Sequence, residues 1–337
     1  MSQGADCVIL GTNAGRRVNA RRSDRLAMAV LGAAIALVLP LVAGGPATAD
    51  ARSLEVVTIA TPPLEPAALA FYADARGFFR KHGIEAKIVV LPNPGAVAAA
   101  IVAGDATFGP ADIGGLMLGK SRGLQVRLVA AGATYQRLHP TAALVSAPGK
   151  RFARARDLVG RRIGVDRTGS IAHVALLKWL KRGGVRADAV KLSYHAFPDM
   201  IGLLIRGRVD AAILPEPYLT QARQRGARLV APIFHSVCTT ECLLTGWIAR
   251  SDVHRSLAAR FRNAIQEAAV WANNRENDTA SGAILARHTK LGPAVIRRMT
   301  RSTFATRLRL RLAQPWVAVY KEFELIPNTF AAPDLLE

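Results

Sequence analysis

The chain has few cysteines, few aromatic residues and few acids. It holds three cysteines in 337 residues, aromatic side chains make up 6% of it, and 24 acidic residues face 45 basic ones. It contains no serine-hydrolase elbow, no glycine-rich phosphate loop followed by lysine, and no helix with paired metal ligands. A basic helix with interleaved aromatics, which is typical of nucleic-acid binding, is also missing. These absences argue against the common hydrolases and nucleotide-binding enzymes, and we expect no nucleic-acid partner.

The cysteines that remain after the first 49 residues are Cys238 and Cys242. In an oxidising compartment such a close pair can form a disulfide, provided that its Cα atoms lie within about 7 Å of each other. Two buried thiols are the alternative. A metal site that adds His235 is a third interpretation, but no fourth ligand lies nearby in the sequence, so we expect no metal.

Residues 1–49 have the features of an export signal peptide. Arg21 and Arg22 precede an apolar stretch at residues 26–42, and Ala47 and Ala49 provide a cleavage-like site. The ordinary secretory route and the twin-arginine route both fit this pattern. A retained membrane anchor is the alternative, although about 17 residues is short for a span. The sequence therefore predicts export, with a periplasmic mature chain.

The charge of the chain is strongly positive. The formal net charge is +21, and it falls to +18 without residues 1–49, which carry five arginines and two aspartates. Such a balance favours anionic partners through long-range attraction but says nothing about the fold. Arginines cluster again between residues 297 and 311, where we expect a solvated helical face.

Residues 160–218 repeat the pattern of residues 56–113. In each copy a short apolar run ends at small polar residues, a helix follows, and two more strand-like runs come after it. Gly83 corresponds to Gly184 and Gly104 to Gly207, so the register hardly drifts. A repeat of this length is a whole sub-domain, and strands that alternate with helices predict parallel sheets covered on both faces.

We therefore predict an α/β fold of two similar lobes with mostly parallel sheets. Residues 50–138 and 250–337 would form the first lobe, and residues 139–249 the second. The chain would cross between the lobes at residues 138–146 and again at residues 243–250. The helical tail after residue 253 has no strand of its own and would pack on the first lobe.

Ligands of open parallel sheets bind beyond the carboxyl ends of the strands, in this case between the lobes. This rule selects a first set of residues in one lobe and a second set in the other. The predicted ligand-binding residues are Thr61, Pro62, Asn93, Ala111 and Asp112, and Thr168, Gly169, Ser170, His173, Tyr194, Glu216 and Tyr218.

Thr168-Gly169-Ser170 is the most informative of these segments. Ser170 is a natural N-cap, and the helix that follows would direct its positive dipole end toward the ligand, which favours an anionic group. Simple capping without a ligand explains the same residues. Asp112 and Glu216 could bind an amine or hydroxyl of the solute, or stabilise a helix start. His173 could face either the cleft or the core.

Four segments, at residues 71–84, 102–105, 157–165 and 207–217, together resemble the periplasmic solute-binding proteins of nitrate-, sulfonate- and taurine-type ABC importers. The resemblance implies the two-lobed (type II) periplasmic-binding-protein fold and a monomeric, non-enzymatic receptor without a cofactor, which delivers a small solute to a membrane permease. Thr107 departs from the family, which often has an acid there, and the cysteine pair is not a general feature. Enzymes and binding proteins for thiamine-pyrimidine precursors share the fold family, and a solute sensor for a membrane receptor is a third alternative.

Overall fold

The computed structural model describes residues 53–289 and 291–336. The export segment at residues 1–49 lies outside these ranges. None of the helices within the described ranges is long and apolar enough to cross a membrane.

The strands are β1 (Glu55–Thr61), β2 (Ile84–Val90), β3 (Gly109–Asp112), β4 (Val126–Ala131), β5 (Ala133–Gln136), β6 (Ala142–Ser146), β7 (Arg162–Val165), β8 (Lys191–Tyr194), β9 (Ala211–Pro215), β10 (Arg228–Ala231), β11 (Glu241–Leu243), β12 (Thr245–Arg250) and β13 (Thr303–Phe304). The helices are α1 (Leu69–Ala75), α2 (Phe78–Lys81), α3 (Pro94–Ala103), α4 (Ile113–Ser121), α5 (Ile171–Arg182), α6 (Phe197–Ile205), α7 (Tyr218–Gln224), α8 (Arg255–Asn273), α9 (Asp278–Thr289), α10 (Pro293–Arg298) and α11 (Gln314–Glu322).

The two sequence copies fold with the same strand order. β1 pairs in parallel with β2 on one side, and a parallel bridge from Ile59 to Phe108 joins its other side to the segment just before β3. In the second copy β7 pairs in parallel with β8 and with β9. The glycines that align the copies have φ angles of 73° and 69° (Gly83 and Gly184) and of 86° and 67° (Gly104 and Gly207). Other residues rarely adopt this left-handed conformation, so the glycines set the same turns in both copies.

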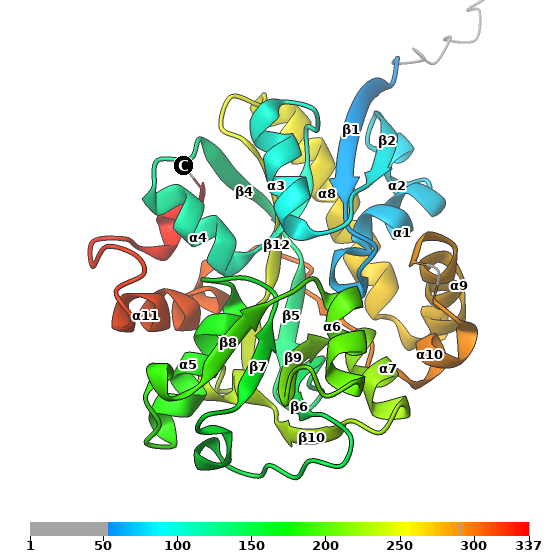
Figure 1. The fold of residues 1–337 in the computed structure, drawn as a ribbon. Coiled ribbons are helices and arrows are strands. Elements are labelled where there is room, and N and C mark those ends of the chain that lie inside the picture. The colour runs from blue at the N-terminus through cyan, green and yellow to red at the C-terminus, as the bar shows by residue number, and fades with distance from the viewer. Residues whose placement is uncertain (1–52, 290, 337) are drawn as a thin grey trace, which may run out of the picture. The chain divides into compact units, whose positions relative to one another are not determined.

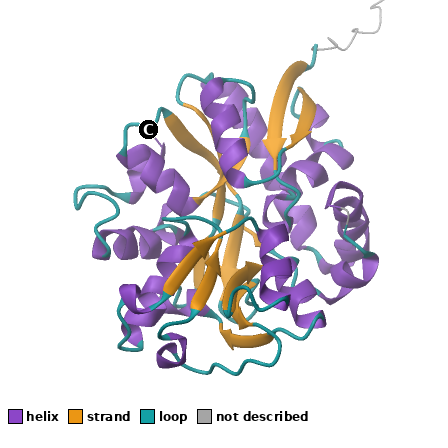
Figure 2. Cartoon of the chain, in the orientation of Figure 1, coloured by secondary structure: helices purple, strands orange, loops and turns teal. Residues whose placement is uncertain are grey.

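A five-stranded sheet in the order β10-β6-β9-β7-β8 forms the centre of the second lobe. Side chains alternate across a strand, so neighbouring residues of β6 and β9 face opposite sides. Leu144 and Ile213 share a core with α5, whereas Val145 and Leu214 pack with α6 and α7. Figure 1 shows α5 on one side of this sheet and α6 with α7 on the other, and Figure 2 shows helices on both sides of the central strands.

The return crossing lies earlier in the chain than expected. The chain leaves the five-stranded sheet after β10 and re-enters the first lobe at β11, so residues 232–240 form the crossing. Residues 245–250, which we expected to cross, form β12, and β12 pairs antiparallel with β3 and β4. An apolar strand-like run does not reveal which sheet it joins, and this run lies in the first lobe. The βαβ units pair in parallel, as predicted, but the pairings that β6, β10, β11, β12 and β13 make are antiparallel. The five-stranded sheet therefore mixes both directions, and the two three-stranded sheets are antiparallel, where mostly parallel sheets were expected.

The helical tail contacts both lobes. α8 packs on α1, α2 and β4, and its buried side chains recur at helical spacing on one face. α9 packs on α1 and α10, in agreement with the expected docking on the first lobe. α11 differs, because it contacts α4 of the first lobe and α5 of the second, an arrangement visible in Figure 1. Trp316 and Tyr320 on α11 are fully buried there.

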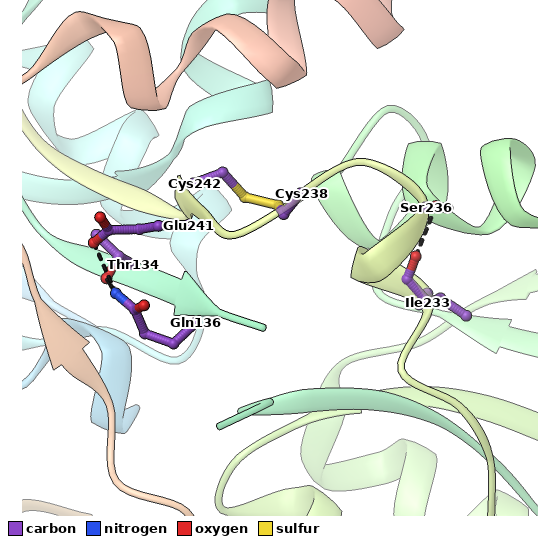
Figure 3. Close-up of a disulfide and its surroundings, with 7 residues drawn as sticks. All are labelled: Thr134, Gln136, Ile233, Ser236, Cys238, Glu241 and Cys242. Carbon is purple, nitrogen blue, oxygen red and sulfur yellow. Dashed lines mark hydrogen bonds between the residues drawn. A yellow bond between two sulfur atoms is a disulfide. The ribbon is translucent and has the colours of Figure 1, made fainter. Parts of the chain in front are cut away.

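Cys238, in the return crossing, and Cys242, in β11, form a disulfide with their Cα atoms 5.6 Å apart. Figure 3 shows it where β11 begins, beside the side chains of Gln136 and Glu241, which are hydrogen-bonded at 2.7 Å between Nε2 and Oε1. His235 does not complete a metal site with the two sulfurs: its Nε2–H donates to the carbonyl of Arg137 at 3.1 Å. The hydrogen bond from His235 to Arg137 connects the return crossing to the first crossing.

Candidate ligand-binding site

The carboxyl ends of β3 and β7 meet at an ion pair between Asp112 and Arg167. Asp112 caps α4, since its Oδ1 accepts the backbone N–H of Gly115 at 2.9 Å. Arg167 is half-buried, and the loss of water around its guanidinium lowers its pKa. The pair joins the first lobe to the second. Sequence reasoning selected Asp112 but missed Arg167, although a cation between a strand end and the Thr-Gly-Ser helix cap was a usable signal.

Ser170 is the N-cap of α5, as its sequence context predicted. Its Oγ accepts the N–H of His173 at 3.1 Å and donates to Oδ1 of Asp166 at 2.5 Å. The serine is 1% exposed, so both of these bonds are shielded from water. Burial raises the pKa of Asp166 to about 6, against the opposing effect of the hydrogen bond from Ser170. The cap is therefore coupled to a carboxyl group that titrates near neutral pH.

His173 points back toward the strand end rather than into the core. Its Nδ1 accepts the backbone N–H of Gly169 at 3.0 Å, so the neutral ring carries its proton on Nε2. Burial lowers the pKa of the imidazole, which keeps it neutral at pH 7. The ring meets Tyr194, the last residue of β8, edge-on at 6.1 Å between centroids. Tyr194 is 45% exposed, so this pair reaches the surface.

Small residues let three elements converge here. Gly169 has a φ of 72°, and a Cβ at this position would lie 2.6 Å from Cδ1 of Leu118 on α4. Its carbonyl accepts the hydroxyl of Tyr320 on α11 at 2.7 Å. A Cβ on Gly114 would lie 1.7 Å from the same hydroxyl oxygen. The segment after β7 is thus enclosed by α4 and α11, with Thr168 left exposed.

The remaining first-lobe candidates have structural roles in this conformation. Thr61 is buried and its Oγ1 donates to the carbonyl of Ala67 at 3.1 Å. Pro62 is buried beside it, and Ala111 lies opposite Gly246 in the β3–β12 ladder. Asn93 is exposed and caps α3, accepting the N–H of Ala96 at 2.9 Å. No hydrogen bond or ring contact among the described residues links these four to the group around Arg167.

Glu216 uses both carboxylate oxygens inside the protein. Oε2 accepts the N–H of Thr220 at 3.0 Å, and Oε1 accepts the hydroxyl of Thr220 at 2.9 Å and the N–H of Thr300 at 3.3 Å. Burial raises its pKa. Of the two predicted roles of Glu216, the structure therefore shows the stabilisation of a helix start, that of α7. The bond to Thr300 also connects the second lobe to the helical tail. Tyr218 stacks on Phe197 at 5.8 Å, and burial raises the pKa of its phenol.

A buried ion pair that the sequence did not reveal lies after β1. Glu65 is 0% exposed; its Oε1 is 2.8 Å from Nε of Arg301, and its Oε2 accepts the N–H of Ser302 at 2.7 Å. Arg301 also donates to the hydroxyls of Tyr72 and Ser281 and to the carbonyl of Asp278. The pair fixes the tail to the first lobe. No group of three or more potential metal ligands occurs among residues 53–289 and 291–336.

The two lobes and the two crossings define the two-lobed fold that periplasmic binding proteins share. The family description "NMT1/THI5 like" matches residues 67–278, more than half of the chain, and the chain belongs to this family. This confirms the predicted two-lobed α/β fold and the predicted family relationship. A search of curated proteins finds no match.

Solved structures with the same fold include receptors and an enzyme. The periplasmic aliphatic sulphonate binding protein SsuA from Escherichia coli is 18% identical, with a TM-score of 0.67 over 85% of this chain and 92% of that one. The alkanesulfonate-binding protein SsuA from Xanthomonas axonopodis pv. citri, bound to MOPS, is 16% identical, with a TM-score of 0.69 over 84% and 98%. The desulfurization enzyme DSZB is 19% identical, with a TM-score of 0.62 over 84% and 96%. At such identities the likeness shows the fold alone.

Proposed function

We propose that the chain is the substrate-binding component of an ABC importer, which captures a small anionic or zwitterionic solute between its lobes. The family membership and the fold shared with sulfonate-binding proteins support this class. The observation that carries the proposal is the Asp112–Arg167 ion pair, because it places a partly desolvated cation of one lobe against the other lobe.

In the proposed complex, the anionic group of the solute takes the position of the Asp112 carboxylate beside Arg167. The start of α5 favours an anion at the same place through its dipole. Thr168, Gly169, Ser170, His173 and Tyr194 form the second-lobe wall. On the first-lobe side Asp112 faces Arg167, and the proposal adds Thr61, Pro62, Asn93 and Ala111 as the wall that approaches the solute when the lobes close. Tyr218 completes the site from the start of α7, where both carboxylate oxygens of Glu216 are used within the protein.

The solute acts by shifting a population of conformations. Only the closed arrangement of the lobes lets the solute contact both walls at once, so binding favours closure. The proposed hinge consists of residues 137–141 and 232–240, which join the sheets of the two lobes. A permease in the inner membrane would then recognise the closed, monomeric receptor in the periplasm, after export directed by residues 1–49.

An enzyme is the second candidate, because the desulfurization enzyme DSZB shares the fold. Both cysteines of the described part of the chain, Cys238 and Cys242, are joined in the disulfide and so offer no free thiol. We therefore favour a receptor that has neither catalytic residues nor a cofactor. Turnover of a bound sulfonate or sulfinate, followed by mass spectrometry, would decide for the enzyme.

A thermal-shift screen tests the proposed function. Purified protein is heated with alkanesulfonates, taurine, nitrate, aromatic acids and thiamine-pyrimidine precursors. A ligand that binds only the folded state adds about 2.7 kcal/mol to the free energy of unfolding at 100 times its dissociation constant. We expect a clear rise of the midpoint with one anionic or zwitterionic class. Folded, ligand-free protein that responds to none of them would contradict the proposal.

A further inference from the structure

A cavity of about 910 Å³ lies within the helical tail, apart from the predicted ligand-binding residues. Its walls come from the end of α8, from α9 and α10, from residues 299–303, and from His139 in the first crossing. None of the residues predicted to line the cleft between the lobes contributes to it. The volume is within the range of about 300–1,000 Å³ that is typical of small-molecule sites.

Four arginines and one acid line this cavity. The arginines are Arg275, Arg287, Arg297 and Arg301, and the acid is Asp278. Arg301 is held by Glu65 and makes hydrogen bonds with four of its five N–H groups. The other three arginines are exposed and form no ion pair with any residue of the described ranges, so their guanidinium groups are free to bind an anion.

The buried part of the cavity lining is mostly apolar, and Ser302 is its polar residue. Ile296 and Met299 are 7% and 5% exposed. Gly282 also lines the cavity and lets α9 lie close to α10, since a Cβ there would be 3.0 Å from Cγ2 of Ile296. Ser302 also lines the cavity; it is 7% exposed, and its Oγ has no hydrogen-bond partner among the described residues. A buried hydroxyl of this kind normally has a partner, and an acceptor oxygen on a ligand would supply it.

We infer that this cavity binds a small organic anion, namely a carboxylate or sulfonate on an apolar body. The apolar body lies on Ile296 and Met299, and the anionic group lies among the free arginines, where guanidinium groups bind two-oxygen anions well. The cavity shares no lining residue with the proposed cleft. The two sites are nevertheless linked through Thr300, whose N–H donates to Glu216, so a ligand that orders residues 299–303 also stabilises a contact between the lobes.

Isothermal titration calorimetry with 1-naphthalenesulfonate and with decanoate tests the inference, and uncharged naphthalene-1-methanol serves as the ligand control. The protein carries Arg167→Gln, which removes the cation of the proposed cleft site. In this background we expect saturable 1:1 binding of both anions. Adding Arg287→Gln and Arg297→Gln should weaken binding at least about tenfold, the effect of losing one or more charge-assisted hydrogen bonds.

The matched control is the pair Arg298→Gln and Arg309→Gln, which removes the same charge from exposed arginines of the tail that do not line the cavity. It should leave the affinity within twofold. Ala283→Trp, which fills the cavity from an exposed position on α9, should abolish binding with the folded midpoint retained. Equal losses in the two arginine pairs, binding by the Trp variant, equal affinity for the uncharged ligand, or no saturable binding would overturn the inference. Each of these results leaves the cleft proposal to be judged separately by the thermal-shift screen.

Discussion

Arg167, two residues beyond β7, is ion-paired with Asp112, the residue that caps α4 in the other lobe. In the proposed function, an anionic solute competes with the Asp112 carboxylate for the guanidinium group of Arg167. In the absence of solute, the Asp112 carboxylate partly neutralises the charge of Arg167. Removing the charge of Arg167 and removing the charge of Asp112 should therefore change the affinity for the solute in opposite directions.

Arg167→Gln should weaken binding of the anionic solute about tenfold or more, because one charge-assisted hydrogen bond is lost. Asp112→Asn should bind the solute as tightly as the wild type or more tightly, since asparagine still caps α4 but no longer competes for Arg167. Calorimetry with the solute found in the screen measures both. Equal weakening in the two variants would show that the pair acts as a structural unit instead.

Asp166 should make stability fall as pH rises through the mildly acidic range. Its pKa is about 6 in the folded chain, above the ordinary value of 3.8 for an aspartic acid side chain. Between these values the unfolded chain has lost the proton that the folded chain keeps, so the free energy of unfolding decreases up to about pH 6 and this contribution is then constant. The shift corresponds to a destabilisation on the order of 2–3 kcal/mol above pH 6.

Asp166→Asn isolates this effect, because the amide cannot ionise and its oxygen can still accept the Ser170 hydroxyl. We expect the variant to gain stability over the wild type between pH 4.5 and pH 7, as measured by urea unfolding. A constant difference between variant and wild type across this range would mean that Asp166 titrates normally.

Removing Arg301 should be costly. Glu65 is fully buried, and without its partner it remains an uncompensated charge. Arg301→Met should therefore lower the free energy of unfolding by about 3–5 kcal/mol. Arg298→Met, on an exposed arginine three residues earlier, should change it by less than about 0.5 kcal/mol. Adding Glu65→Gln to Arg301→Met should recover part of the loss; if it deepens the loss, the cost comes from packing rather than from charge.

The repeat allowed much of the fold to be predicted from the sequence. Gly104 and Gly207 occupy equivalent left-handed turns, so their spacing carried real structural information. The cap at Ser170 was also predictable, because capping depends on a few adjacent residues. The place of β12 was not, since strand partners are chosen by long-range packing that leaves no local pattern.

The site was predictable only in part, for the same reason. The strand-end rule found Asp112, but Arg167 became visible as its partner only when the two lobes were placed together. Glu216 was selected by position, yet its oxygens are used by Thr220 and Thr300, and Thr300 lies 84 residues further along the chain. Contacts over such separations depend on the tertiary fold and not on the sequence around either residue.

The disulfide should stabilise the return crossing modestly. It joins residues separated by four positions, and closing so short a loop in the unfolded chain is worth about 2 kcal/mol in the chain-entropy model. Both sulfurs are buried, so alanine is the better replacement than serine. Cys238→Ala with Cys242→Ala should lose about 2 kcal/mol in urea unfolding without a change in the m-value. Adding reductant to the urea titration should lower the free energy of unfolding of the wild type by a similar amount and leave that of the variant unchanged. If reductant does not change the free energy of unfolding of the wild type, the two thiols are not linked in the protein.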